Sequence, residues 1–136
     1  MAQFRLSLRS LARLDGVHPV LIEVVKSAIL RTTVDFTVVE GLRTPERQRE
    51  LVAAGKSQTL NGLHLRQADG YGHAVDLAPL VGGAIPWNDW AKFKDLAYVV
   101  KACAATVGVP VEWGGDWKTL KDGPHFQLPR GWKAAG

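Results

Sequence analysis

Apolar residues recur every three or four positions in two long stretches of the chain, and this spacing predicts two core helices. The first is expected over residues 19–31, because Pro19 is a favoured first helical residue and the β-branched residues at 32–34 would end the helix. Its buried face is expected to carry Leu21, Val24, Val25, Ala28 and Ile29.

The second long helix is expected to begin at Asn88 or Asp89 and to end before Gly108 and Pro110. Its apolar positions alternate spacings of three and four residues, as on a buried helix face. This stripe comprises Trp90, Phe93, Ala97, Val100, Ala104 and Val107.

A shorter helix is predicted over residues 45–54. Thr44 and Pro45 form an N-cap and first-turn pair, and Gly55 is typical of the position just past a helix end. Arg43 then lies between a strand and this helix, where functional side chains are often placed. These residues alone leave a solvated surface arginine as the alternative.

The remaining apolar segments are short and bounded by glycine, proline or polar residues. They predict strands at residues 35–40, 73–80, 111–113 and 125–128. Helices to one side of a small, mostly antiparallel sheet make an α+β fold. Since no repeat or linker-like segment divides the chain, residues 1–136 are expected to form a single domain.

Composition narrows the class of partner. Of the 136 residues, 46% are hydrophobic and 22% are charged, so disorder is not expected. The formal net charge of +4 suits a polyanion, either nucleic acid or an anionic cell wall, although the basic residues are spread along the chain. Cys103 is the only cysteine, which excludes a disulfide framework, and its apolar surroundings predict a small buried residue.

The N-terminal residues 1–9 lack the continuous apolar segment of a secretory signal, so synthesis in the cytoplasm without a signal peptide is expected. No apolar run approaches the roughly 20 residues of a membrane-spanning helix. Action outside the cytoplasm would then require that the inner membrane be opened.

Two of the four histidines are not expected to take part in chemistry. His18 precedes Pro19 at a helix entry and is expected to be structural or exposed. His73 stands three residues before Asp76, so in a strand its side chain points to the opposite face.

Asp76 stands in the middle of an apolar strand, where a carboxylate is costly unless it is paired or bound to a metal. An ion pair or a cap is the alternative. His64, on a polar loop predicted over residues 56–72, and His125 could join Asp76 in a zinc site with a fourth position open for water. Asp122, three residues before His125, is then a candidate general base.

These residues belong to motifs that form a specific combination. The combination comprises His64, the GHAVD run that ends at Asp76, the WGGDW turn at 113–117 and the DGPHF run at 122–126. Together with the VEGLRT segment at 39–44, they resemble the zinc peptidases of the D-alanyl-D-alanine carboxypeptidase family, and in particular phage endolysins with L-alanyl-D-glutamate endopeptidase activity. The resemblance runs from about residue 10 to residue 128.

The resemblance implies a fold like that of the hedgehog and D-alanyl-D-alanine peptidases, and roles for individual residues. His64, Asp76 and His125 would bind Zn²⁺, and Asp122 would be the catalytic acid and base. Arg43 would contact the substrate and polarise the scissile carbonyl. Substrate contacts are expected from Arg43, Gln48, Tyr71 and Trp113, while core packing is the alternative for Trp113.

The sequence departs from the family pattern in two places. Gly62 stands where the family has serine, and residues 65–69 appear as an insertion between His64 and the glycine that follows. Asp69 keeps the family's spacing to Asp76 and is therefore a rival to His64 as a ligand. The insertion is expected to lie outside the metal site.

The expected function is that of a zinc-dependent peptidoglycan hydrolase, an endolysin that cleaves the L-alanyl-D-glutamate bond of the stem peptide. The alternatives are a D-alanyl-D-alanine carboxypeptidase and a catalytically silent cell-wall-binding domain. Bacterial peptidoglycan is the expected partner of a monomeric protein, and nucleic acid is not, because no recognition motif for it is present. The expected location is the host cytoplasm until the membrane is permeabilised, and then the periplasm and cell wall.

Overall fold

The computed structural model describes residues 3–57 and 62–134, so part of the loop predicted over residues 56–72 lies outside the described residues. Within the described chain, four strands form an antiparallel sheet in the order β1-β2-β4-β3. They are β1 (Phe36–Glu40), β2 (Ala74–Pro79), β3 (Glu112–Trp113) and β4 (His125–Gln127). Each lies within a predicted strand segment, and the predicted α+β fold is confirmed.

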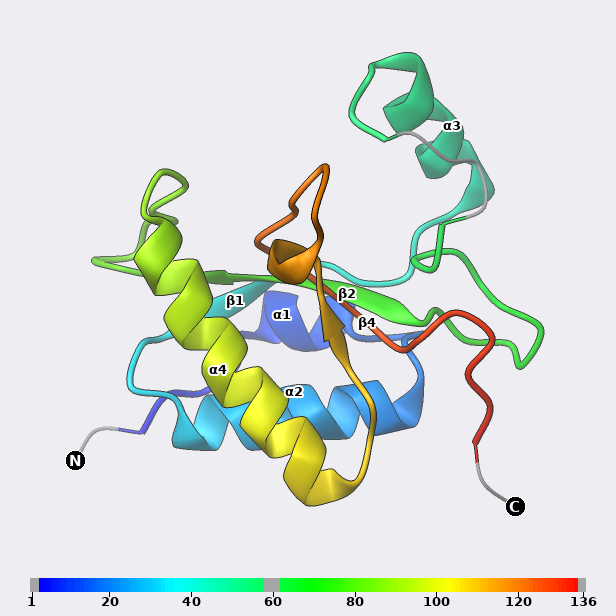
Figure 1. Cartoon of the computed structure of the whole chain (residues 1–136). Helices are drawn as coiled ribbons and strands as arrows, with labels where there is room; N and C mark the ends of the chain where they lie inside the picture. The colour runs from blue at the N-terminus through cyan, green and yellow to red at the C-terminus, as the bar shows by residue number, and fades with distance from the viewer. Residues whose placement is uncertain (1–2, 58–61, 135–136) are drawn as a thin grey trace.

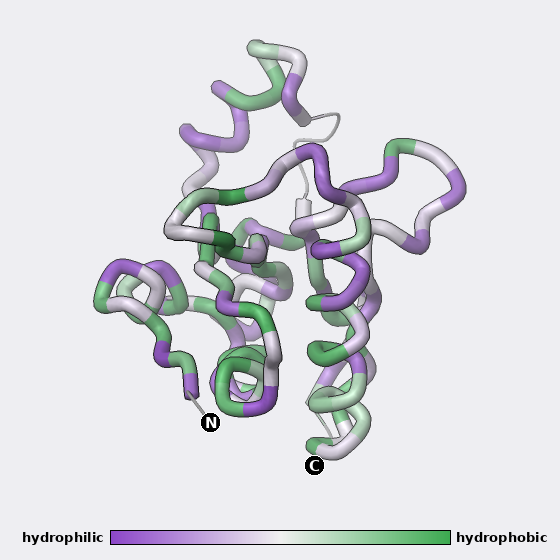
Figure 2. The backbone as a smooth tube through the Cα atoms, turned by 90° about the vertical axis from the view of Figure 1, so that its left-hand side faces the viewer, coloured by the Kyte–Doolittle hydropathy of each residue, from purple (hydrophilic) through white to green (hydrophobic). Residues whose placement is uncertain are grey.

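Five helices accompany this sheet among the described residues. They are α1 (Leu8–Arg13), α2 (Pro19–Arg31), α3 (Pro45–Ala53), α4 (Trp90–Val107) and the short 3-10 helix η1 (Gly114–Asp116). Figure 1 shows α1, α2 and α4 on one side, whereas α3 projects beyond the other side. In Figure 2, apolar and hydrophilic positions alternate along α4, as expected for a helix with one buried face.

The helix ends follow the predicted local signals. His18 caps α2, because its Nδ1 accepts a 3.1 Å hydrogen bond from the backbone N–H of Val20. The Thr44 side chain caps α3, which begins at Pro45. Gly108 ends α4 with φ 83, a left-handed conformation that glycine adopts without strain. A structural role for His18 is thereby confirmed, and all five residues predicted for the buried face of α2 are buried.

The predicted stripe on α4 is wrong at its first residue. Trp90 is 45% exposed, because it is the first residue of α4. Its ring stacks on that of Trp113, with ring centroids 5.5 Å apart. Val107, at the other end of the stripe, is only partly buried. Cys103 is buried in the core, as predicted.

The short helix α1 was not predicted. Ser7 caps its first turn, and the Ser10 hydroxyl accepts a 2.9 Å hydrogen bond from the N–H of Val38, which docks the helix on β1. A helix of this length has little stability of its own. Its formation therefore depends on this contact with a strand distant in the sequence.

The alternation of side-chain directions along β2 decides on which face of the sheet Asp76 lies. Val75 and Leu77 are in the hydrophobic core beneath the sheet, so Asp76 between them points to the opposite face. Antiparallel pairing then places Asp76 directly opposite His125 on β4, and a bulge in β1 places Glu40 on its other side. Charged and titratable side chains from three strands thus meet on the face away from α2 and α4.

Candidate active site and metal centre

Three predicted ligands come together on this face. His64 Nε2 lies 3.1 Å from Asp76 Oδ1, and His125 Nδ1 lies 3.3 Å from the same oxygen. Each of the three residues offers one ligand atom, and these atoms all lie within 4.8 Å of one another. Among the described residues this is the one cluster of histidine and acidic side chains close enough to hold a metal ion. Two imidazoles and a carboxylate that converge in this way fit a transition-metal ion.

A backbone carbonyl orients His64. Its Nδ1–H donates a 2.9 Å hydrogen bond to the carbonyl oxygen of Gly41, which leaves Nε2 directed at Asp76. Residue 41 must be glycine, because a Cβ there would lie 1.9 Å from the carbonyl oxygen of Arg13. The N–H of Arg43 also donates to the His64 carbonyl at 2.8 Å, so the loop is tied to the end of β1.

A side chain on the same strand orients His125. Its Nε2–H donates a 2.8 Å hydrogen bond to Gln127 Oε1, and Gln127 Nε2 donates to Glu112 Oε1 at 3.1 Å. The imidazole therefore turns Nδ1 towards Asp76. Sequence reasoning missed both partners, although Gln127 stands two residues from His125 and in a strand shares its face.

The carboxylate of Asp76 is held in its charged form. Burial alone would raise its pKa, but the neighbouring His64 and His125 hold the pKa well below its ordinary value. A carboxylate must be ionised to serve as a metal ligand, so this charged state suits Asp76 to that role. The predicted alternative of an ion pair is realised in the same arrangement, because Arg43 Nη2 lies 3.8 Å from Asp76 Oδ2.

Asp122 lies beside this cluster in the turn that leads into β4. Its carbonyl oxygen accepts the N–H of His125 at 3.2 Å, and its N–H donates to the Gly114 carbonyl at 3.1 Å. Burial raises the pKa of Asp122, and the negative charge of Asp76 raises it further. A carboxylate with a raised pKa, beside a candidate metal centre, is suited to taking up and returning a proton.

The WGGDW turn supports Asp122 from beneath. The Trp113 indole N–H donates a 2.6 Å hydrogen bond to the Gly123 carbonyl oxygen, and Trp113 is only 5% exposed. A Cβ on Gly114 would lie 2.4 Å from the carbonyl oxygen of Asp122, so the turn can approach this closely only with glycine. Trp113 therefore supports the turn that carries Asp122 from the side of the core.

Arg43 is a fixed cation rather than a solvated one. Its Nε and Nη2 donate 2.8 Å hydrogen bonds to the two carboxylate oxygens of Glu40, and Nη1 donates to Gln48 Oε1 at 2.8 Å. Burial would raise the pKa of Glu40, but the Arg43 guanidinium lowers it below its ordinary value. Sequence reasoning also missed Glu40, which stands three residues before Arg43 at the end of β1.

These groups line a cleft of about 790 Å³. It contains the three candidate ligands together with Asp122, Arg43 and Gln48. Trp87 and Trp117 also line it, and the Trp117 ring lies 5.1 Å from that of His125. The lining also includes three basic residues, Lys56, Lys121 and Arg130.

Two of the residues expected to contact substrate do not line this cleft. Trp113 is buried beneath the site, and the ring of Tyr71 packs against His18 at 5.1 Å instead. Asp69, the rival ligand, is also elsewhere, since its Oδ2 lies 2.7 Å from His73 Nε2. His73 thus points away from Asp76, as the alternation predicted.

Residues 65–69 form part of a loop that returns to the sheet outside the ligand cluster. Gln67 N–H donates to the Tyr71 carbonyl at 2.9 Å, and Gly70 N–H donates to the Gln67 carbonyl at 2.9 Å. Isolated bridges join Arg43 to Leu65 and Arg66 to Gly72. The loop is therefore held by hydrogen bonds among its own residues, and His64, just before it, contacts Asp76.

Comparison with known proteins agrees with this geometry. The family model of the phage L-alanyl-D-glutamate peptidases matches residues 1–128. The L-alanyl-D-glutamate peptidase of Escherichia phage T5 is 29% identical over 128 residues, which cover 94% of this chain and 91% of that protein. The peptidoglycan L-alanyl-D-glutamate endopeptidase CwlK of Bacillus subtilis is 28% identical over 133 residues, covering 84% of this chain and 74% of CwlK.

A solved structure is also similar. The crystal structure of the L-Ala D-Glu endopeptidase ChiX of Serratia marcescens superimposes with a TM-score of 0.82 at 47% sequence identity. The match covers 93% of this chain and 90% of that one.

No helix among the described residues is long and apolar enough to cross a membrane.

Proposed function

The chain belongs to the phage L-alanyl-D-glutamate peptidase family, and we propose that it is a zinc-dependent peptidoglycan hydrolase that cleaves the bond between L-alanine and D-glutamate in the stem peptide. The observation that carries this proposal is the convergence of His64, Asp76 and His125 in a cleft that also contains Asp122 and Arg43. The identity of the cleaved bond is inferred from the relatives, which are named L-alanyl-D-glutamate peptidases or endopeptidases.

The ligand cluster fits zinc by its chemistry. His64 Nε2, His125 Nδ1 and a carboxylate oxygen of Asp76 would hold the ion, and this donor set suits zinc better than the all-oxygen shells of calcium or magnesium. When bound, zinc supplies Lewis-acid activation of a water molecule and of the scissile carbonyl. The protein's contribution is to orient the two histidine ligands before the metal arrives, through the Gly41 carbonyl and Gln127.

Asp122 is the proposed proton carrier. The oxygen of the attacking water bonds to the carbonyl carbon of L-alanine while one of its protons moves to the Asp122 carboxylate. The carbon–nitrogen bond then breaks, and Asp122 returns the proton to the amine of D-glutamate. Burial and the negative charge of Asp76 raise its pKa, which makes the carboxylate a stronger base for the first transfer.

Arg43 is the proposed electrostatic partner of the scissile carbonyl. Glu40 and Gln48 fix the guanidinium before substrate binds, so no reorganisation is needed when negative charge develops on the carbonyl oxygen. One preorganised donor of this kind contributes about 3–4 kcal/mol in well-studied hydrolases. Lys56, Lys121 and Arg130 give the cleft a basic rim that suits the carboxylates of a stem peptide.

The test is digestion of purified sacculi followed by mass spectrometry of the new peptide termini. A new N-terminal D-glutamate supports the proposal, whereas release of D-alanine alone would assign a D-alanyl-D-alanine carboxypeptidase. No release by the zinc-loaded protein would favour a silent wall-binding domain. The proposed biological setting is bacterial lysis, in which the protein reaches the wall once the inner membrane has been opened.

A further inference from the structure

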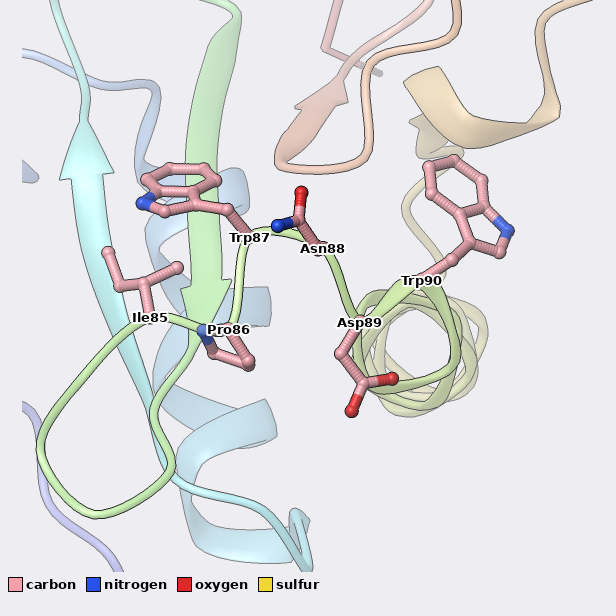
Figure 3. Close-up of a pocket in the computed structure, with 6 residues that line it drawn as sticks. All are labelled: Ile85, Pro86, Trp87, Asn88, Asp89 and Trp90. Carbon is pink, nitrogen blue, oxygen red and sulfur yellow. The ribbon is translucent and has the colours of Figure 1, made fainter.

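Two exposed tryptophans border a second hollow next to the active-site cleft. A pocket of about 600 Å³ is lined by Trp87, Asn88, Trp90 and their neighbours in the segment of residues 85–90. Trp87 is 58% exposed and Trp90 is 45% exposed, although tryptophan is normally among the more buried residues. Figure 3 shows both indole rings and the Asn88 amide directed to the same side of this segment, while Asp89 points the other way.

Both rings are held in place by stacking on aromatic residues of the core side. Trp87 stacks on Phe93, with ring centroids 6.0 Å apart and an interplanar angle of 25°. Trp90 stacks on Trp113 at 5.5 Å and 30°. Large, rigid aromatic surfaces of this kind can bind a ligand at little cost in side-chain entropy.

The pocket adjoins the catalytic cleft at Trp87. Trp87 lines both the pocket and the cleft that contains Asp122. At the other end, a Cβ on Gly123 would lie 3.2 Å from the Trp90 ring, so Trp90 packs directly beneath the turn that carries Asp122. A ligand in the cleft that extends past Trp87 would therefore enter this pocket.

The chemistry of peptidoglycan puts a sugar close to the scissile bond. The L-alanine of the stem peptide is joined directly to the lactyl group of N-acetylmuramic acid, and one residue spans at most about 3.6 Å. A hydrolase of the L-alanyl-D-glutamate bond must therefore accommodate the glycan strand close to the bond that it cleaves. Pyranose rings carry C–H groups on their faces, which pack on indole rings, and their N-acetyl and hydroxyl groups hydrogen-bond to amides such as that of Asn88.

We propose that Trp87, Asn88 and Trp90 form a subsite for the N-acetylmuramic-acid-containing glycan strand that carries the stem peptide. The subsite rests on the proposed function, because its ligand is the part of the same substrate that precedes L-alanine. It makes the enzyme selective for stem peptides that are still attached to glycan.

The first test compares a disaccharide-linked stem peptide with the free peptide of the same sequence. The wild-type protein should hydrolyse the linked substrate with the higher kcat/KM. In Trp87→Ala the ratio of the two kcat/KM values should fall by about 10-fold, as expected when the apolar contact with one sugar ring is lost, and Trp87→Tyr should retain most of the ratio. Tyr98→Ala is the matched control, since Tyr98 is a 77% exposed aromatic residue on α4 outside the pocket and the cleft. An unchanged ratio in Trp87→Ala would overturn the subsite.

The second test does not depend on hydrolysis. Peptide-free N-acetylglucosaminyl-N-acetylmuramic acid is titrated into the protein, and the indole N–H resonances are followed by NMR. Selective shifts of the Trp87 and Trp90 signals are expected in the wild type, and the shift of the Trp90 signal should be lost in Trp87→Ala. Absence of these shifts would refute sugar binding, whereas shifts in a protein that cleaves neither substrate would refute the proposed hydrolysis and leave a glycan-binding site.

Discussion

Gln127 Oε1 accepts a 2.8 Å hydrogen bond from His125 Nε2, and this contact fixes which imidazole nitrogen faces Asp76. With the proton held on Nε2, Nδ1 keeps a free lone pair for a metal ion. Glu112 in turn accepts a hydrogen bond from Gln127 Nε2 at 3.1 Å and so fixes the orientation of the amide. Two residues on adjacent strands, Gln127 and Glu112, thereby orient one candidate metal ligand.

The first prediction concerns this pair. Gln127→Leu should weaken zinc binding by about 10- to 100-fold, because the His125 ring loses the acceptor that orients it. Gln127→Glu keeps an acceptor for His125 but loses the hydrogen bond to Glu112, so its affinity should lie between those of the wild type and Gln127→Leu. Competition with a chromophoric chelator measures both. Equal affinities of the wild type and Gln127→Leu would show that Gln127 does not position the ligand.

The second prediction concerns the metal itself. Elemental analysis of the purified protein should find a single zinc ion per chain, chelation should abolish hydrolysis, and added zinc should restore it. His125→Ala should lose the metal, and the melting temperature of the wild type should rise with zinc, because a ligand that binds only the folded state stabilises it. Full activity after complete removal of metal would contradict the assignment.

The third prediction separates Asp122 from the ligands. Asp122→Asn should retain zinc and wall binding but lose at least about 100-fold in kcat, because it can neither accept nor return a proton. His125→Ala is the comparison, since it should lose metal and activity together. A kcat for Asp122→Asn within a few fold of wild type would assign the proton transfer to another group.

The fourth prediction concerns the Glu40–Arg43 pair. The pKa of Glu40 is lowered in the folded protein, so the pair contributes stability that is present above the ordinary glutamate pKa of about 4.3 and is lost as the pH falls through the lower folded value. Glu40→Gln should therefore reduce the free energy of unfolding by about 1.5–3 kcal/mol at pH 7, the range for hydrogen bonds to charged groups. The difference should shrink towards zero at strongly acidic pH.

Urea unfolding of metal-free wild type and Glu40→Gln at several pH values measures this difference, and the absence of metal keeps zinc release out of the comparison. A Glu50→Gln variant is a suitable control, because Glu50 is an exposed residue whose carboxylate lies 3.9 Å from Arg47 Nη1. A difference between wild type and Glu40→Gln that stays constant with pH would refute the pairing as the source of the stability.

The sequence by itself determined the features that depend on near neighbours along the chain. Pro19 and Gly108 mark helix ends because their backbone preferences act within a single turn. The period of two along β2 was enough to put Asp76 on the face opposite Val75 and to separate it from His73. Glycine, proline and capping residues therefore predicted where most helices end, and the periodicity of apolar residues predicted the side on which each residue lies.

Only the tertiary structure decided which distant residues meet. The antiparallel register of β2 and β4 sets Asp76 opposite His125, and no local pattern in either strand specifies that pairing. No local pattern specifies the contact of α1 with β1 either. Nor does one specify that the Trp113 ring packs on Trp90 and the Tyr71 ring on His18, outside the cleft. These contacts depend on how the whole core packs, because packing energy is shared among segments far apart in the sequence. Short-range preferences fix the segments, and the long-range packing assembles the site.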